Sequence, residues 1–410
     1  MFVRHWDTYT TANRNSIWLA IISKKTAQCS QFEISKLKNA LKRTGLESPI
    51  PPFGGTDHFD IGTNGLIFTA KEPDLNPALH TKTNIYLLTS ESFWDDLPSL
   101  PELQKVVIPG FEGASTGPVF SPNGRKAAFL SMKTDGYESD KNQLFVLSDI
   151  FAPSSILNVY GSDDRRGRWD RSPQLIAWNQ QDESILYLVA EDHGRRCLFA
   201  STLSEAGVAL PQMIVRGGAI SDVRPLKNGD LFLTSTTLVD NSIYSLLTVP
   251  NHETMILSSA TKAGSKFGLS SEQVLEIHWD GAREDTSIHA WVIRPSTFNP
   301  RERYPLAYLI HGGPQGAWED AWSTRWNPAV FAEQGYVVIC PNPTGSTGYG
   351  QDFTDAIRGQ WGGLPYEDLV KGLDWIESNL NYVDMDRAVA LGASYGKYPP
   401  FKETQVLPPI

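Results

Sequence analysis

The chain has 410 residues, of which 40% are hydrophobic, 20% charged and 11% aromatic, a composition typical of folded proteins with two or three domains. It carries 36 basic and 46 acidic side chains, a net charge of −10, without a run rich in lysine and arginine. This charge excludes a basic nucleic-acid footprint. The longest apolar stretch, residues 17–22, is far shorter than the roughly 20 residues of a membrane-spanning helix. We therefore expect no nucleic acid and no membrane as partner.

Metal and cofactor chemistry have no signature in the sequence. The three cysteines, Cys29, Cys197 and Cys340, are too scattered for a zinc site or a disulfide framework. The histidines show neither H-E-x-x-H nor another paired-ligand spacing. The glycine-rich residues 345–350 lack the Lys-Ser/Thr end of a P-loop and are interpreted as a tight loop beside a site. We expect no metal and no cofactor.

The first two thirds of the chain repeat a strand, a turn and a second strand. Turn positions 65, 124, 183 and 229 are separated by 59, 59 and 46 residues. Such spacing is close to the ~40–50 residues of one four-stranded propeller blade with loop insertions. The repeated strands are expected at 66–69, 127–130, 185–188 and 231–234, and their partners at 84–88, 143–147, 197–200 and 242–247. The pattern predicts an incomplete β-propeller over residues 1–265, with an antiparallel β-sandwich as the alternative.

Residues 266–410 have a different sequence pattern, in which apolar strands alternate with helices. Strands are expected at 306–310, 336–340 and 388–391. Helices are expected at 328–334 and from Pro365, where apolar residues recur at helical spacing. Buried strands that alternate with helices predict a parallel α/β sheet.

The last of these strands runs directly into Gly392-Ala393-Ser394-Tyr395-Gly396, a G-x-S-x-G motif. In a nucleophile elbow, glycines flank a serine on a strained turn after a buried strand, where its hydroxyl can meet substrate. Residues 113–117 match the same motif, but they lie in the repeat region and precede Pro118. We interpret Ser115 as an ordinary turn serine and Ser394 as the candidate nucleophile.

A serine hydrolase also needs hydrogen-bond donors for the oxyanion of its tetrahedral intermediate. The turn His311-Gly312-Gly313-Pro314 follows an early sheet strand, a usual position for one of these donors. The second would be the backbone N–H of Tyr395. For His311 itself we favour a structural role at the strand end over proton transfer.

With these motifs in place, the chain resembles the prolyl oligopeptidase family (S9) of serine peptidases, and within it the secreted fungal dipeptidyl-peptidase V branch. The matching stretches are residues 2–9, 45–57, 311–316, 341–350, 361–363 and 390–396. The resemblance implies a propeller that filters access to an α/β-hydrolase domain, here the N-terminal part of one over residues 266–410. It also implies secretion and cleavage of peptide substrates near their N-terminus through an acyl-serine intermediate. Ser394 would be the nucleophile, with Tyr395 and the Gly312-Gly313 turn around the oxyanion and Gly392 and Gly396 shaping the elbow.

The family's catalytic Asp and His find no match in this sequence. In α/β-hydrolases both follow the nucleophile, whereas residues 397–410 contain neither His nor Asp, and Glu403 is their only acid. The family continues after the elbow with a glycine and a helix, but this chain reads Lys397-Tyr398-Pro399-Pro400. We expect a sequence truncated at both ends and inactive as written. Because Gly396-Lys397-Tyr398 can be encoded with the donor-like sequence GTAAGT, the last fourteen residues are predicted to be a translated intron.

The sequence is also compatible with two other functions. One is a noncatalytic, propeller-based binding protein or pseudoenzyme that keeps an inert hydrolase half. The other is a related acylaminoacyl-peptidase or esterase, which would differ in its preference for N-acetylated or ester substrates.

Overall fold

The computed structural model describes residues 4–25, 31–89, 103–203, 209–249 and 251–397. The chain divides into two compact units. The first unit comprises Met1–Trp169, Pro173–Leu186 and Thr202–Leu210, and the second comprises Asp170–Ser172, Tyr187–Ser201 and Pro211–Ile410. These two units are defined by their compactness alone. The domain boundary at residue 265 therefore stays a prediction. Within the described ranges, no helix is long and apolar enough to cross a membrane.

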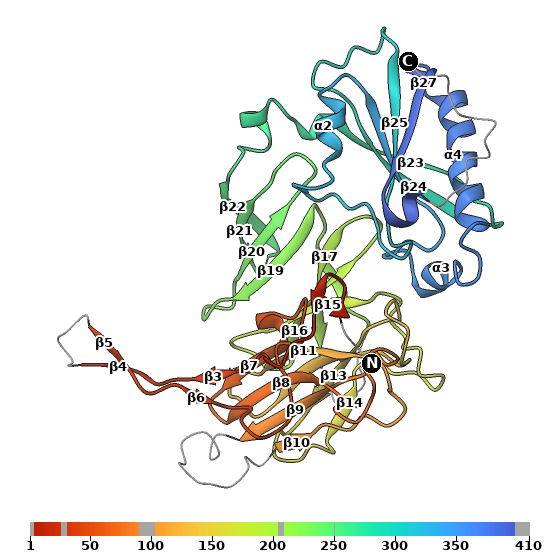
Figure 1. Cartoon of the computed structure of the whole chain (residues 1–410). Coiled ribbons are helices and arrows are strands. Elements are labelled where there is room, and N and C mark those ends of the chain that lie inside the picture. The colour runs from red at the N-terminus through yellow and green to blue at the C-terminus, as the bar shows by residue number, and fades with distance from the viewer. Residues whose placement is uncertain (1–3, 26–30, 90–102, 204–208, 250, 398–410) are drawn as a thin grey trace. The chain divides into compact units, whose positions relative to one another are not determined.

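The first unit is built mainly of antiparallel β-sheet (Figure 1). Two sheets have four strands each, and within each sheet consecutive strands are neighbours. Their strands are β7 (Phe59–Gly62), β8 (Gly65–Lys71), β9 (Thr83–Thr89) and β10 (Leu103–Lys105), then β11 (Ser115–Phe120), β12 (Ala127–Ser131), β13 (Gln143–Leu147) and β14 (Ile156–Asn158). Shorter or separate strands are β1 (Arg4–His5), β2 (Thr8–Tyr9), β3 (Trp18–Leu19), β4 (Ile22–Lys24), β5 (Phe32–Ile34), β6 (Lys38–Asn39) and β15 (Pro173–Trp178). This arrangement is propeller-like, as predicted from the repeats.

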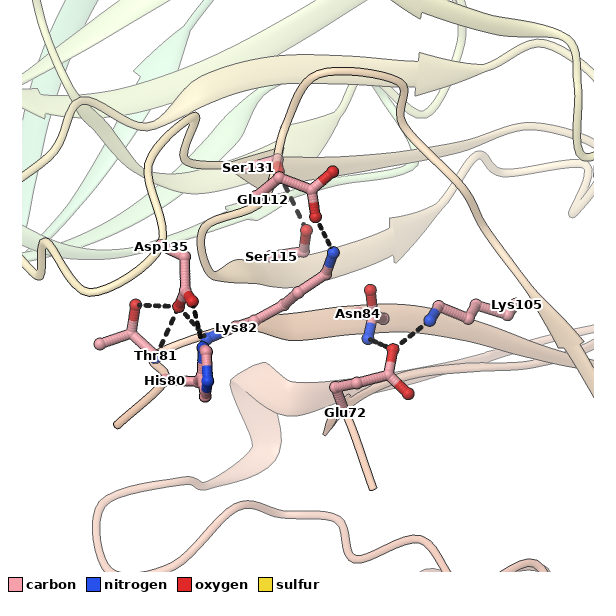
Figure 2. A network of polar contacts seen from close by, with 10 residues as sticks. All are labelled: Glu72, His80, Thr81, Lys82, Asn84, Lys105, Glu112, Ser115, Ser131 and Asp135. Atoms are coloured by element: carbon pink, nitrogen blue, oxygen red, sulfur yellow. Dashed lines mark hydrogen bonds and ion pairs between the residues drawn. The ribbon is translucent and has the colours of Figure 1, made fainter. Parts of the chain in front are cut away.

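Ser115 lies on a strand, which corrects its interpretation as a turn serine. It opens β11, its side chain is buried, and its hydroxyl lies 3.0 Å from that of Ser131 on β12 (Figure 2). Its backbone N–H donates to Oγ1 of Thr83, which in turn donates to the Ser115 carbonyl. Gly117 therefore belongs to a bulged sheet strand that pairs with β12, and the Ser115 hydroxyl is held inside the first unit.

A carboxylate ties two loops of these neighbouring sheets together (Figure 2). Asp135, between β12 and β13, accepts from the backbone N–H groups of Thr81 and Lys82, at 2.9 and 3.2 Å, and also contacts Nδ1 of His80. The Lys82 ammonium pairs with Glu112 beside them. These contacts connect the β8–β9 loop to the chain around β11 and β12, so the two sheets are joined by polar side chains as well as by apolar packing.

Strands of the same kind continue beyond the first unit. β16 (Ile185–Glu191) and β17 (Arg196–Thr202) run from one unit into the other. In the second unit, β18 pairs with β17, and β19 to β22 form an antiparallel meander. These strands are β18 (Gln212–Val215), β19 (Ala219–Pro225), β20 (Leu231–Thr236), β21 (Ile243–Thr248) and β22 (Glu253–Ser259). All eight strands predicted from the repeats are present, as β8, β9, β12, β13, β16, β17, β20 and β21.

The rest of the second unit contains a five-stranded sheet in the order β23-β24-β26-β25-β27. Its strands are β23 (Val274–Asp280), β24 (Ser287–Ile293), β25 (Tyr304–Ile310), β26 (Val337–Asn342) and β27 (Val383–Gly392). The sheet as a whole is mixed rather than parallel, although the three predicted strands, β25, β26 and β27, run parallel as expected. β25 runs parallel to β26 and β27, whereas β24 is antiparallel to both β23 and β26.

Three α-helices accompany this sheet: α2 (Pro328–Ala332), α3 (Gln351–Asp355) and α4 (Leu364–Asn379). Short 3₁₀ turns are η1 (Thr56–His58), η2 (Ser265–Phe267), η3 (Ser271–Gln273) and η4 (Ser394–Lys397). The predicted apolar stripe of α4 packs on the sheet, with Leu369 and Ile376 fully buried in the core cluster that contains Tyr308 and Trp279. Gly372 lies between them on the same helix face, where a Cβ would come within 2.6 Å of both the Trp279 ring and the Tyr308 hydroxyl oxygen.

We predict that Gly372→Ala destabilises the protein, although alanine is the better helix former by roughly 1 kcal/mol. The added methyl overlaps two buried rings that are held by hydrogen bonds to the α4 backbone, so the helix must move off the sheet. Overpacking of this kind costs about 1–3 kcal/mol. Urea unfolding followed by circular dichroism measures the change, with the exposed Glu377→Ala on the same helix as a control expected within about 0.5 kcal/mol. Equal stability of the two variants would show that α4 does not approach the sheet this closely.

Candidate active site

Ser394 follows the end of β27 by two residues and occupies a strained backbone conformation. Its φ is +56°, a left-handed value that side chains other than glycine rarely adopt, and its side chain is exposed. β27 pairs in parallel with β25, and Gly392 lies opposite Ile310 in this pairing. The serine thus sits at the C-terminal edge of parallel strands, where α/β sheets place their ligands.

The flanking glycines are required by close main-chain contacts. A Cβ on Gly396 would lie 2.5 Å from the carbonyl oxygen of Ile310, and a Cβ on Gly392 would lie 2.4 Å from the carbonyl oxygen of Gly396. Neither backbone atom can be moved by a simple side-chain rotation. The turn can therefore form only when both positions lack a side chain.

The structure brings the predicted oxyanion turn against the predicted nucleophile. A Cβ on Gly312 would lie 3.1 Å from the carbonyl oxygen of Ala393 and 3.4 Å from Cβ of Ser394, so the two turns touch. Gly313 has a φ of +126°, a value that only glycine adopts readily. Tyr395 packs inward beside Ser394, where burial, together with the negative charge of nearby Asp368, raises the pKa of its phenol to about 12.

His311 has a hydrogen-bonding partner at each ring nitrogen. Nδ1 lies 2.8 Å from the carbonyl oxygen of Gly312 and therefore donates, and Nε2 lies 3.0 Å from Oγ of Ser346. Burial lowers the pKa of the imidazole, which favours the neutral form. These contacts favour the structural role expected for this histidine, because the ring fixes the Gly312 turn to the loop that carries Ser346.

That loop, residues 343–350, is fixed at its start by the Asp368 carboxylate, which the sequence analysis did not single out. Asp368 on α4 is fully buried, and its oxygens accept from the backbone N–H groups of Thr344 and Ala282, at 2.7 and 2.6 Å. Burial raises its pKa, and these hydrogen bonds act in the opposite direction. The carboxylate joins two loops that are far apart in sequence, and no local pattern announces this.

A buried histidine holds the far end of the same loop. Nδ1 of His289, on β24, lies 2.6 Å from the hydroxyl of Tyr349, which also accepts from the Asn342 amide at 2.8 Å. Nε2 of His289 faces the Glu276 carboxylate at 3.2 Å, and Glu276 binds the Arg195 guanidinium with both oxygens. Burial dominates and lowers the pKa of His289 to about 4, against the attraction of Glu276.

Glu319 lies on the segment that follows the Gly312 turn and is also largely buried. One carboxylate oxygen is 3.1 Å from Nε of Arg196, while the other has no hydrogen-bond partner. Burial raises the pKa of Glu319 to about 7, since it outweighs the attraction of Arg196. Sequence reasoning missed His289, Glu319 and Asp368 because each acts through residues distant in the chain.

The geometry supplies an exposed hydroxyl on a strained turn, with a second glycine turn in contact with it. Such a pair can present a nucleophile and backbone donors to one carbonyl group. In the described part of the chain, no group of three or more His, Cys, Asp or Glu side chains could hold a metal ion. The predicted tail after Lys397, including Glu403, lies outside the described residues.

The chain is similar to members of one family of peptidases. Residues 322–399 match the Prolyl oligopeptidase family, Peptidase_S9. The chain is 40% identical over 97% of its length to dipeptidyl-peptidase 5 of Schizosaccharomyces pombe and covers 55% of that protein. It is 38% identical to dipeptidyl-peptidase 5 of Aspergillus fumigatus, with 97% of the chain and 54% of that protein covered. The chain thus spans about half the length of the curated relatives it matches.

Solved structures share the fold. Acylaminoacyl peptidase of Pyrococcus horikoshii superposes with a TM-score of 0.63 at 18% identity, over 90% of this chain and 51% of that one. Dipeptidyl peptidase 4 of Porphyromonas gingivalis gives a TM-score of 0.55 at 16% identity, over 94% of this chain and 54% of that one. At these identities the likeness concerns the fold, a mostly antiparallel β region followed by a mixed sheet with helices.

Replacing Ser394 by glycine should stabilise the protein by about 1 kcal/mol, because glycine adopts a φ of +56° without the steric cost of a Cβ. Ser394→Ala keeps the Cβ and should leave stability unchanged within about 0.5 kcal/mol. Urea unfolding of both variants and the wild type measures the difference. If Ser394→Gly were no more stable than Ser394→Ala, Ser394 would not occupy the strained conformation.

His289 and Glu319 should give opposite pH dependences of stability. The pKa of His289 falls from 6.5 to about 4 on folding. Below pH ~6.5 the unfolded state therefore binds a proton that the folded state does not, and the free energy of unfolding decreases as pH decreases. The pKa of Glu319 rises from 4.5 to about 7 on folding. Above pH ~4.5 the folded state therefore keeps a proton that the unfolded state loses, and the free energy of unfolding decreases as pH increases. Between pH ~4.5 and ~6.5 each effect amounts to about 2 kcal/mol, and in the wild type the two cancel.

The two variants separate these effects. Relative to the wild type, Glu319→Gln should make the free energy of unfolding rise by about 2 kcal/mol between pH ~4.5 and ~6.5, and His289→Asn should make it fall by a similar amount. Urea unfolding at three pH values measures both slopes. A common vertical offset with parallel curves would mean that neither group titrates abnormally.

Proposed function

We propose that the chain is a serine peptidase of the prolyl oligopeptidase family, in which Ser394 is the nucleophile. The left-handed φ of Ser394 at the end of β27 carries this proposal. In a nucleophile elbow, this strain lifts the hydroxyl out of the sheet toward substrate. The similarity to proteins named dipeptidyl-peptidase 5 supports release of short peptides from the N-termini of oligopeptides. A secreted location is part of the same proposal.

In the proposed reaction, Oγ of Ser394 attacks the carbonyl carbon of the scissile peptide bond. The negative charge that develops on the carbonyl oxygen would be stabilised by the backbone N–H of Tyr395 and by the Gly312-Gly313 turn. The contact between Gly312 and Ser394 supports this arrangement, because it places backbone beside the nucleophile without an intervening side chain. A general base would take the hydroxyl proton and give it to the amine, which leaves as the C–N bond breaks, and water then hydrolyses the acyl-serine.

Activation of Ser394 requires a general base, since an unassisted serine hydroxyl is a weak nucleophile. In this fold the base and its acidic partner come after the nucleophile, and no His or Asp follows Ser394 in the sequence. His311 is half-buried and has a hydrogen-bonding partner at both ring nitrogens, so it is not poised for the role. We propose that Ser394 is positioned but not activated by the 410 residues. Binding and an oxyanion hole alone give at best roughly 10³–10⁴-fold over water.

A second candidate function is a noncatalytic binding protein that retains the hydrolase fold, because among the described residues no histidine is hydrogen-bonded to the Ser394 hydroxyl. The two candidates differ in whether Ser394 reacts once a base is supplied. A chimera provides this test. Residues 1–396 are joined to the segment that follows the matching glycine in the Schizosaccharomyces pombe relative.

A fluorophosphonate probe, followed by peptide mapping, reports activated serines. We expect the chimera to be labelled at Ser394 and the 410-residue chain to be labelled at least about 100-fold more slowly. The chimera should also hydrolyse X-Ala dipeptide amides in preference to N-acetylated amides and simple esters.

The second G-x-S-x-G motif provides a matched control. Ser115→Ala in the chimera should leave labelling intact, because Ser115 is a buried strand residue, whereas Ser394→Ala should abolish it. A folded chimera that remains unlabelled at Ser394 would overturn the proposed nucleophile. Rapid labelling of the 410-residue chain would mean that a base is supplied from elsewhere in it.

A further inference from the structure

An exposed aromatic side chain lies beside the candidate nucleophile. Trp361 belongs to the segment between α3 and α4, and its side chain is 56% exposed. An exposed indole offers a large apolar surface to a ligand group that comes near it. The sequence offers only the triplet Trp361-Gly362-Gly363, which does not indicate what the ring does.

Two contacts couple Trp361 to the elbow. The Tyr395 hydroxyl donates to the backbone carbonyl of Trp361 at 2.6 Å, and the two rings meet edge to face with centroids 5.8 Å apart. Tyr395 is buried and follows Ser394 directly, while the Ser394 side chain is exposed. The indole is therefore held in one place next to the turn that carries the hydroxyl, with most of its surface open to solvent.

From this geometry we infer that Trp361 is a specificity-determining residue, whose indole receives an apolar or aromatic side chain of the peptide held at Ser394. A rigid ring loses little conformational freedom when it is covered, and aromatic faces and edges attract apolar and aromatic groups. This inference rests on the proposed function, because it takes Ser394 as the point where the peptide is held.

The alternative is that the tryptophan only anchors the elbow. The hydrogen bond from Tyr395 ends on the main-chain carbonyl, which every residue type provides, so Trp361→Ala retains it. An anchoring ring would affect all peptides equally, whereas a specificity residue affects those with a large apolar side chain. The two roles can thus be separated by comparing ligands.

The experiment measures binding without chemistry, in the full chain carrying Ser394→Ala. Isothermal titration calorimetry with Phe-Ala-amide, Ala-Phe-amide and Gly-Gly-amide gives the dissociation constants. We expect Trp361→Ala to weaken at least one phenylalanine-containing ligand about 10-fold and Gly-Gly-amide less than 2-fold. Trp361→Phe should restore binding to within about 3-fold of the parent.

Trp326 provides a matched control, because it is another exposed tryptophan of the second unit, 48% exposed and packed on Arg325. Trp326→Ala should change none of the three constants. Equal weakening of all ligands by Trp361→Ala, unchanged constants, or no binding by the parent chain would each overturn the inference. Trp361-dependent binding together with an unlabelled Ser394 in the chimera would remove the proposed catalysis and leave the binding role of Trp361 intact.

Discussion

The candidate site depends on one steric constraint, the close approach of two main chains at the ends of β25 and β27. Gly396 faces the Ile310 carbonyl so closely that no side chain fits between them, and Gly392 faces Gly396 in the same way. With the chain folded back this tightly, the residue between the glycines must take a left-handed φ, and that residue is Ser394. Tyr395 then turns inward, and the Gly312 turn comes to lie against the serine. The exposure of the hydroxyl follows from backbone packing rather than from any polar contact.

The loops around this turn are held by buried polar groups that carry an electrostatic cost. Asp368 and Glu319 are carboxyl groups whose burial favours the neutral form, and His289 is an imidazole whose burial also favours the neutral form. Because acids and bases respond to burial with pKa shifts of opposite sign, the sum is less sensitive to pH than any single group. This balance suits loops that must keep their positions around the candidate nucleophile over a range of pH.

The fold was largely predictable because its main signals are local. Apolar runs and turn residues marked the repeated strands, and Asn327-Pro328 marked the start of α2, where the Asn327 side chain accepts from the Ala329 N–H. The alternation with helices predicted the parallel direction of β25, β26 and β27. It gave no sign of β23 and β24, which are antiparallel to their neighbours, since an apolar run reads the same in a parallel or an antiparallel sheet. Ser115 was misplaced because a five-residue motif says nothing about the register of the strand that contains it. Ser394 was identifiable from a motif joined to a strand. Asp368 instead has partners 24–89 residues away, and His289 contacts Tyr349 60 residues away, so neither leaves a local trace.

Positioning and activation of a nucleophile have separate physical origins in this molecule. The contacts that shape the turn lie within residues 305–396, as strand pairing, two glycines and the Tyr395–Trp361 contact. An acid and a base would act on the hydroxyl after it is placed, and they contribute nothing to the left-handed φ. The strain at Ser394 is therefore present whether or not the serine is activated. Other non-glycine residues, among them His193 and Asp285, also have a positive φ, so the strain at Ser394 draws its meaning from its place between two glycines at the end of β27.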